Sequence, residues 1–116
     1  MQRTFVHLPP FERRWREFEL GDEELRLLQV WLLLYPTDGA VVKGTNGIRK
    51  VRWNVGGKGK RGGLRIFYVD FPNHGLTFLI TAIKKSQDTD LDRGEQDELS
   101  ELVLQLTRRL RRSGEN

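Results

Sequence analysis

Cysteine is absent from the 116-residue sequence, and histidine occurs only at His7 and His74. Without cysteine there is no disulfide framework, thiolate zinc site or cysteine nucleophile, which is compatible with a reducing compartment. His7 is expected in a strand and His74 in a turn, so an acid–base pair of histidines facing one phosphate is not expected. The sequence also lacks a cluster of residues with metal-ligand spacing, and we predict no bound metal.

Long apolar runs are missing as well. The longest is Val30–Tyr35, far below the roughly 18 residues that a membrane-spanning helix needs. The N-terminus does not have the pattern of a secretory signal. We therefore expect a cytoplasmic protein without a membrane partner. Hydrophobic residues at 37% and charged residues at 31% fit one folded domain over residues 1–116.

Two short helices are predicted in the N-terminal third. Aromatic residues from Phe11 to Phe18 recur at helical spacing, and Gly21 is the predicted end of this helix. Asp22 is a plausible N-cap for a second helix, which should stop before Pro36. The two helices should form a hairpin.

Strand patterns flank this hairpin. Residues 4–8 are rich in aromatic and branched side chains and are followed by two prolines, which predicts a short strand. Residues 48–55 alternate with a period of two, so that Lys50, Arg52 and Asn54 share one face and apolar side chains the other. Basic groups are therefore expected on one face of a sheet.

The C-terminal half predicts two more strands and a helix. Residues 64–71 and 76–82 are apolar runs separated by a turn sequence at residues 72–75, typical of an antiparallel hairpin. Asp92 and Glu95 have the spacing of a capping box at the start of a helix. The predicted fold class is α+β, with a mainly antiparallel sheet packed against the helical hairpin and a C-terminal helix.

Acidic residues are absent between Lys43 and Val69, whereas eight basic residues lie there. Because the strands that carry Arg52, Arg65 and Lys85 are expected to be neighbours, these side chains can converge on one surface suited to a polyanion such as nucleic acid. The alternative is a solvated sheet face without a ligand. The basic residues are Lys43, Arg49, Lys50, Arg52, Lys58, Lys60, Arg61 and Arg65, followed by Lys84 and Lys85.

The segment from Gly56 to Gly63 combines glycines with three cations, which lets backbone amides and long side chains approach phosphates. It lacks the spacing of a nucleotide-binding P-loop. If phosphodiester cleavage occurs here, lysine and arginine must neutralise the phosphate, align the nucleophile and donate a proton. Such a site has an inefficient general base, which predicts a partner that aligns the RNA.

Four segments together resemble the RelE superfamily of toxins in its HigB-like branch, and two of them, residues 47–52 and 57–68, occur in order and correctly spaced. Residues 47–52 look like the family's GLRKxR, and residues 57–68 are similar to its GKGKRGGxRxIYY. Residues 85–91 look like K-N-E-x-x-D-L, and residues 5–11 resemble an FxxLPxF opening.

The resemblance implies a type II toxin that cleaves mRNA, commonly on the ribosome, by attack of a ribose 2′-hydroxyl on the adjacent phosphate, without metal or cofactor. It also implies a cognate antitoxin, in this branch typically a helix-turn-helix protein like HigA.

The resemblance also assigns roles to individual residues. Lys50 and Arg52 would hold the phosphate, and Arg65 would stabilise the charge that develops on it. Lys85 would protonate the leaving 5′-oxygen. RNA-binding positions are Arg49, Lys58, Lys60, Arg61 and Lys84.

Two positions depart from the family pattern. Ile83 stands where many relatives have a tyrosine, and Ser86 replaces an asparagine, which affects base stacking or proton transfer there. An alternative function is thus a non-catalytic RNA-binding or operon-regulating domain on the same scaffold. A third is a structural interaction protein with incidental charge. Tyr68 is expected to be a core residue whose hydroxyl finds a partner.

Overall fold

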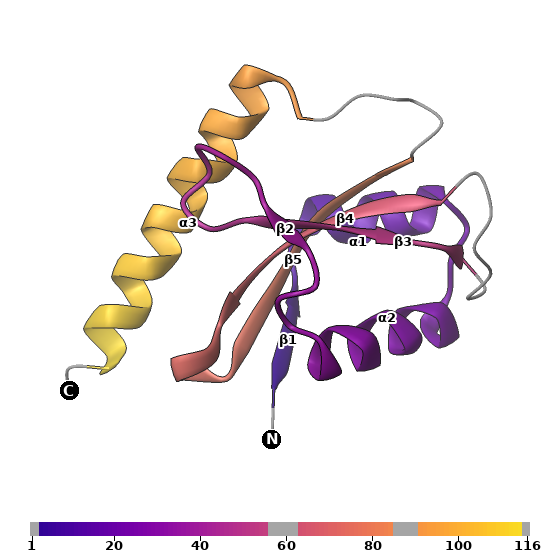
Figure 1. Ribbon diagram of the computed structural model, residues 1–116, viewed down its shortest axis with the longest axis horizontal. Helices are drawn as coiled ribbons and strands as arrows, with labels where there is room; N and C mark the ends of the chain where they lie inside the picture. Colours follow the sequence, from indigo (N-terminus) through magenta and orange to yellow (C-terminus); the bar gives the residue numbers. More distant parts are fainter. Residues whose placement is uncertain (1–2, 56–62, 85–90, 115–116) are drawn as a thin grey trace.

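The computed structural model describes residues 3–55, 63–84 and 91–114. Strands and helices are arranged as a sheet with helices on both faces (Figure 1). In chain order the elements are β1 (Thr4–His7), α1 (Pro9–Glu17), α2 (Asp22–Leu34), β2 (Ala40–Val41), β3 (Arg49–Trp53), β4 (Leu64–Phe71), the 3-10 helix η2 (Pro72–His74), β5 (Leu76–Lys84) and α3 (Arg93–Gly114).

The sheet has five strands in the order β1-β5-β4-β3-β2. β1 is parallel to β5, and each of the other neighbouring pairs is antiparallel. The predicted α+β class is confirmed, as is the β4–β5 hairpin, whose turn ends at Gly75 in the left-handed conformation with φ of 63°. The sequence prediction missed β2, because two exposed residues are too short to show a periodicity.

Each face of the sheet carries its own apolar core. One face, which we call the hairpin face, is covered by α1 and α2 and buries Phe11 and Leu28 against Ile66 and Tyr68. The other, the α3 face, buries Phe67, Val69 and Ile80 together with Val103 of α3. Figure 1 shows α3 on the opposite side of the sheet from α1 and α2. Strand alternation therefore assigns every β3 and β4 side chain to one face or the other.

The ends of the first two helices differ from the prediction by a few residues. α1 ends at Glu17 rather than at Gly21, and Glu19 takes the left-handed conformation with φ of 59°. Gly21 is the N-cap of α2, and Asp22 is its first residue rather than its cap. The acidic first turn still suits the positive end of the helix dipole. The capping box of α3 is confirmed, because the Glu95 amide donates to Asp92 Oδ1 at 2.8 Å and Glu95 Oε1 accepts from the Asp92 amide at 3.0 Å.

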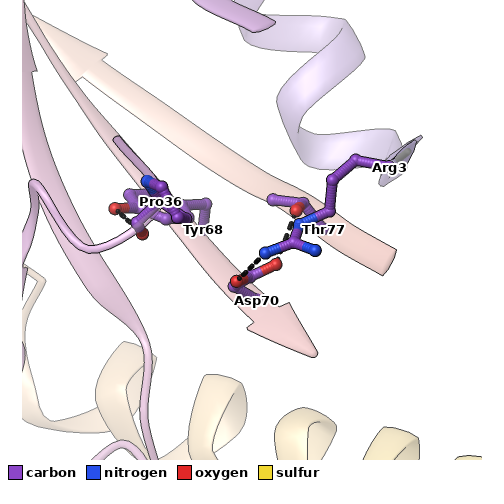
Figure 2. A network of polar contacts seen from close by, with 5 residues as sticks. All are labelled: Arg3, Pro36, Tyr68, Asp70 and Thr77. Atoms are coloured by element: carbon purple, nitrogen blue, oxygen red, sulfur yellow. Dashed lines mark hydrogen bonds and ion pairs between the residues drawn. The ribbon is translucent and has the colours of Figure 1, made fainter. Parts of the chain in front are cut away.

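Tyr68 is fully buried in the hairpin-face core, as predicted, and its hydroxyl ties down the chain between α2 and β2. The hydroxyl donates a hydrogen bond to the Pro36 carbonyl oxygen at 2.8 Å and accepts one from the Gly39 amide at 3.1 Å (Figure 2). Burial raises the pKa of the Tyr68 phenol, opposed in part by the Gly39 hydrogen bond and by the charge of Arg49. The neutral phenol is thus the form that fits the fold.

A second polar network joins the far edge of the sheet to its centre. The Arg3 guanidinium forms an ion pair with Asp70 at 3.0 Å, and Thr77 donates to the other Asp70 oxygen at 2.8 Å (Figure 2). Both charged side chains are nearly buried, at 6% and 11% exposure. Because a buried charge without its partner is costly, this pair fixes the start of β1 beside β4 and β5.

We expect Tyr68→Phe to lower the free energy of unfolding by about 1–3 kcal/mol, because the substitution removes both hydrogen bonds of the hydroxyl and leaves the Pro36 carbonyl and the Gly39 amide without this partner. Urea denaturation followed by circular dichroism measures this change. Tyr35→Phe, at the exposed tyrosine, is the matched control and should change stability little. Equal stability of the Tyr68 variant and the wild type would contradict the anchoring role.

The raised pKa of Tyr68 predicts that the protein loses stability at alkaline pH. As pH rises through about 10, the unfolded chain releases the Tyr68 proton while the folded chain, with its raised pKa, retains it. The unfolded state then binds fewer protons, so the free energy of unfolding falls with increasing pH. Tyr68→Phe should show a shallower decline above pH 10 in the same titration, and an unchanged slope would contradict this assignment.

Candidate nucleic-acid interface

Three predicted site residues lie together on the α3 face of the sheet. Lys50 and Arg52 are two residues apart on β3, on the opposite side from the buried Val51. Arg65 on β4 is the register partner of Arg52, and residues directly opposite in adjacent strands point to the same face. The structure therefore brings Lys50, Arg52 and Arg65 to one surface, which we call the basic face.

The Arg52–Arg65 pairing is the electrostatic centre of the basic face. Opposed side chains in an antiparallel pair have Cβ atoms roughly 4.5–5.5 Å apart, and like charges at such positions oppose folding. Arg52 is exposed and Arg65 is half-buried. Two guanidinium groups at this spacing can donate several hydrogen bonds to one phosphate, which is a geometry that arginine provides better than lysine.

α3 covers only part of its sheet face. The apolar core that it shares with the sheet extends to Val69, Phe71 and Leu76 near the β4–β5 turn. Figure 1 shows α3 at one side of the sheet, whereas the end of β3 and the start of β4 extend away from it. The part of the basic face at the end of β3 and the start of β4 thus has no described helix lying over it, and a ligand can reach it.

Arg49 lies on the opposite side of β3 from the basic face. Its guanidinium donates to the Gly39 carbonyl oxygen at 2.7 Å and to that of Thr37 at 3.4 Å. Because this charge is occupied in holding the segment before β2, its placement favours a structural role over the RNA contact expected from the sequence.

Lys84 also lies on the hairpin face. Its ammonium group is 5.2 Å from the centre of the Phe18 ring, within the range of a cation–π contact. The structure does not bring it together with Lys50, Arg52 and Arg65. The remaining expected positions, Lys58, Lys60, Arg61 and Lys85, are outside the described residues.

Ile83, the departure from the family pattern, is the register partner of Arg65 on β5. It is partly buried against the core of the α3 face. A tyrosine at this position would place a ring and a hydroxyl beside Arg65, whereas isoleucine offers only apolar surface. The basic face therefore has a hydrophobic flank on its β5 side.

Two hollows border the basic face, and neither was predicted from the sequence. A hollow of about 260 Å³ beside Arg52 is lined by Trp31, Asp38, Trp53 and Asn54. A larger one of about 670 Å³ beside Lys50 is lined in part by α3. Their walls come from elements distant in the sequence, so no local motif could have identified these residues.

The two histidines lie apart from the basic face. His7 is on β1, with its ring nitrogen 2.6 Å from the Gln29 amide nitrogen, and His74 contacts the Leu110 carbonyl oxygen at 3.2 Å. Among residues 3–55, 63–84 and 91–114, no group of three or more His, Cys, Asp or Glu side chains is arranged to hold a metal ion. The same ranges contain no helix that is long and apolar enough to cross a membrane.

No family model matches the sequence. Among solved structures, the chain is similar to the E. coli toxin RelE in the free state, determined for a mutant with two arginines changed to alanine. The TM-score is 0.51 with 18% sequence identity, and the match covers 75% of this chain and 87% of that chain. This chain therefore has a RelE-like fold, as expected.

We predict that Arg52→Thr weakens RNA binding while it raises the free energy of unfolding by a few tenths to about 1 kcal/mol, because it relieves the repulsion with Arg65. Binding is measured by fluorescence anisotropy with a single-stranded oligoribonucleotide. The slope of the logarithm of the binding constant against the logarithm of the salt concentration should become shallower by about one. Arg108→Thr, in the C-terminal half of α3, should leave binding unchanged. A destabilised Arg52→Thr protein with wild-type affinity would contradict the prediction.

Proposed function

We propose that this protein is the toxin of a type II toxin–antitoxin pair, an endoribonuclease that cleaves mRNA on the ribosome. The observation that carries the proposal is the convergence of Lys50, Arg52 and Arg65 on the α3 face of a RelE-like sheet, which α3 covers only in part. A fold supports many functions, so the proposal depends on this site more than on the likeness.

In this proposal the nucleophile is the ribose 2′-hydroxyl next to the scissile phosphate. It loses its proton to water and attacks the phosphorus, which forms a 2′,3′-cyclic phosphate. The bond to the 5′-oxygen of the following nucleotide breaks, and that oxygen takes up a proton. Arg65, flanked by β3 and β5, stabilises the negative charge on the pentacoordinate phosphorus, while Lys50 and Arg52 hold the phosphate. Lys85 is the proposed proton donor, and no metal or cofactor is required.

A site built from lysine and arginine can hold the phosphate, but it is a poor general base for removing the proton of the nucleophile, because both side chains are protonated at neutral pH. The missing rate enhancement must then come from alignment, because fixing the 2′-hydroxyl in line with the leaving oxygen contributes several orders of magnitude. The ribosome is the proposed source of that alignment. We propose that Lys58, Lys60 and Arg61 help to position the RNA, and that the protein acts in the cytoplasm.

The proposed antitoxin, a helix-turn-helix protein like HigA, also has a candidate docking surface. α2 exposes an apolar stripe, with Leu34 at 63% exposure and Tyr35 at 50%. This stripe continues through Trp31 into the hollow beside Arg52. Exposed apolar patches of this kind are typical of protein interfaces. An antitoxin bound along α2 would lie next to the basic face and restrict the approach of RNA. The stripe consists of Leu27, Val30, Trp31, Leu34 and Tyr35.

A non-catalytic RNA-binding or operon-regulating domain is the second candidate. Ile83 favours it, because its apolar side chain stands directly beside Arg65, where many members of the family that this chain resembles have a tyrosine. This candidate keeps the basic face for binding and lacks the proton transfer. Its expected behaviour differs from that of a nuclease in one respect, since bound RNA stays intact.

We expect Arg65→Ala to abolish growth arrest and mRNA cleavage, because it removes the proposed stabilising charge at the phosphate. The measurement is inducible expression in bacteria with mapping of mRNA 5′ ends, and Lys85→Ala is tested in parallel. Arg109→Ala, an exposed arginine of α3, is the control and should remain toxic.

Circular dichroism must show that each variant is folded. New cleavage sites within translated frames, lost only in Arg65→Ala and Lys85→Ala, support the nuclease. Cleavage that persists in a folded Arg65→Ala protein contradicts the site assignment. Normal growth with an abundant wild-type protein that binds RNA supports the non-catalytic domain instead.

A further inference from the structure

The larger hollow beside the basic face has no role in the site described above. It measures about 670 Å³ and lies between the β2 edge of the sheet and the first turns of α3. This volume is within the range of roughly 300–1,000 Å³ typical of small-molecule sites. We call it the β2–α3 pocket. The side chains used in the argument below are Lys43, Lys50, Arg93, Gln96 and Asp97, and the pocket is also lined by residues 40, 41, 42 and 44.

The walls of this pocket are fixed by hydrogen bonds. The turn between β2 and β3 is closed by the Val42 amide, which donates to the Ile48 carbonyl oxygen at 2.7 Å, and by the buried Thr45 hydroxyl, which donates to the Val42 carbonyl oxygen at 2.6 Å. The Asn46 amide donates to the Ser100 hydroxyl of α3. Figure 1 shows this turn reaching to α3. The pocket is thus formed before a ligand arrives.

The floor of the pocket joins it to the basic face. Lys50 belongs to both, because it lines the pocket and shares its side of β3 with Arg52. An RNA strand whose phosphate lies on Arg52 and Arg65 would therefore have a neighbouring nucleotide at the pocket entrance. Lys43 and Arg93 add positive charge around this entrance, which favours a polyanion.

The α3 wall of the pocket, on which Asp97 is exposed, offers a different chemistry. Asp97 presents a carboxylate, which accepts hydrogen bonds and donates none when ionised. One residue earlier in α3, the Gln96 side-chain amide nitrogen donates to the Leu91 carbonyl oxygen at 3.1 Å. That hydrogen bond fixes the amide group and assigns its nitrogen, so the Gln96 oxygen is the atom of this side chain that can face a ligand as an acceptor. The wall thus combines two acceptors with cations close by.

We propose that the β2–α3 pocket binds the base of the nucleotide adjacent to the phosphate held by Arg52 and Arg65, and that Asp97 selects guanine. The inference rests on the proposed function, which sets the orientation of the RNA. It adds to that function the identity of the base that the protein recognises. Asp97 is a specificity-determining residue in this scheme, and it takes no part in bond cleavage.

Guanine matches the wall better than the other bases do. Its Watson–Crick edge carries two adjacent donors, the N1 and N2 groups, which pair with the two oxygens of a carboxylate, and its O6 acceptor can meet a cation such as Lys43 or Arg93. Adenine and cytosine present one exocyclic amine beside a ring acceptor that a carboxylate repels, and uracil presents a single ring donor between two carbonyl oxygens. A bidentate contact of this kind discriminates between bases by about tenfold or more.

The test uses the purified full chain and the four ribonucleoside 5′-monophosphates, titrated one at a time with binding followed by NMR chemical shifts. We expect GMP to bind about tenfold more tightly than AMP, CMP or UMP, with shifts at α3 residues 93–97 and at residues 42–44. Asp97→Asn replaces one acceptor with a donor, so it should remove the preference for GMP and shift it toward AMP. Since nucleotide binding requires neither ribosome nor cleavage, this result does not depend on nuclease activity.

Glu101→Gln is the matched control, because Glu101 is an exposed carboxylate one turn further along α3 and outside the pocket. It should bind GMP as the wild type does. Equal affinity for all four nucleotides, no binding, shifts away from the pocket, or the same loss in Asp97→Asn and Glu101→Gln would each overturn the proposal.

If the protein cleaves mRNA in cells, the mapped cleavage sites provide a second test. The wild type and Glu101→Gln should show guanine enriched at one fixed position next to the cut, and Asp97→Asn should lose that enrichment while it still cleaves. Cleavage without guanine enrichment in the wild type overturns the inference and leaves the proposed nuclease standing. Selective GMP binding without any cleavage supports the inference and contradicts the proposed nuclease.

Discussion

The buried hydroxyl of Tyr68 is the interaction on which the functional side of the molecule depends. It holds Pro36 and Gly39 from the centre of the sheet, and this fixes where the chain returns from α2 to form β2. Gly39 lies so close to β3 that an added Cβ would be 2.9 Å from the Lys50 carbonyl carbon and oxygen, so a residue with a side chain cannot take its place without moving the strand. The position of β2 then defines the outer wall of the β2–α3 pocket.

The basic face illustrates a conflict between stability and ligand binding. Opposing Arg52 and Arg65 across two strands costs folding free energy, since like charges at register positions repel. The rest of the fold offsets this cost with two apolar cores and with the nearly buried Arg3–Asp70 ion pair. Such a local cost, maintained on the part of the face that α3 does not cover, is typical of a surface that a polyanion neutralises when it binds.

Much of this arrangement could be predicted from the sequence because the signals are local. The alternation of residues 48–55 correctly separated Lys50 and Arg52 from Val51, and the capping-box spacing of Asp92 and Glu95 located the start of α3. The ends of α1 and the presence of β2 were not predicted. Glu19, after the end of α1, adopts the left-handed conformation expected of glycine. Gly21, the predicted end of the first helix, is instead the N-cap of α2. β2 consists of two residues, and only its hydrogen bonds to β3 make it a strand.

The sequence by itself determined the fold class, the core identity of Tyr68 and the side of β3 on which Lys50 and Arg52 lie, because periodicity and turn chemistry act between residues that are close along the chain. Only the tertiary structure decided which charges act together. It assigned Arg49 to backbone carbonyls on the hairpin face and Lys84 to the Phe18 ring, and it paired Arg52 with Arg65. It also brought Asp97 to the pocket that Lys50 lines. Strand register and helix docking set these distances, and neither has a local signature in the sequence.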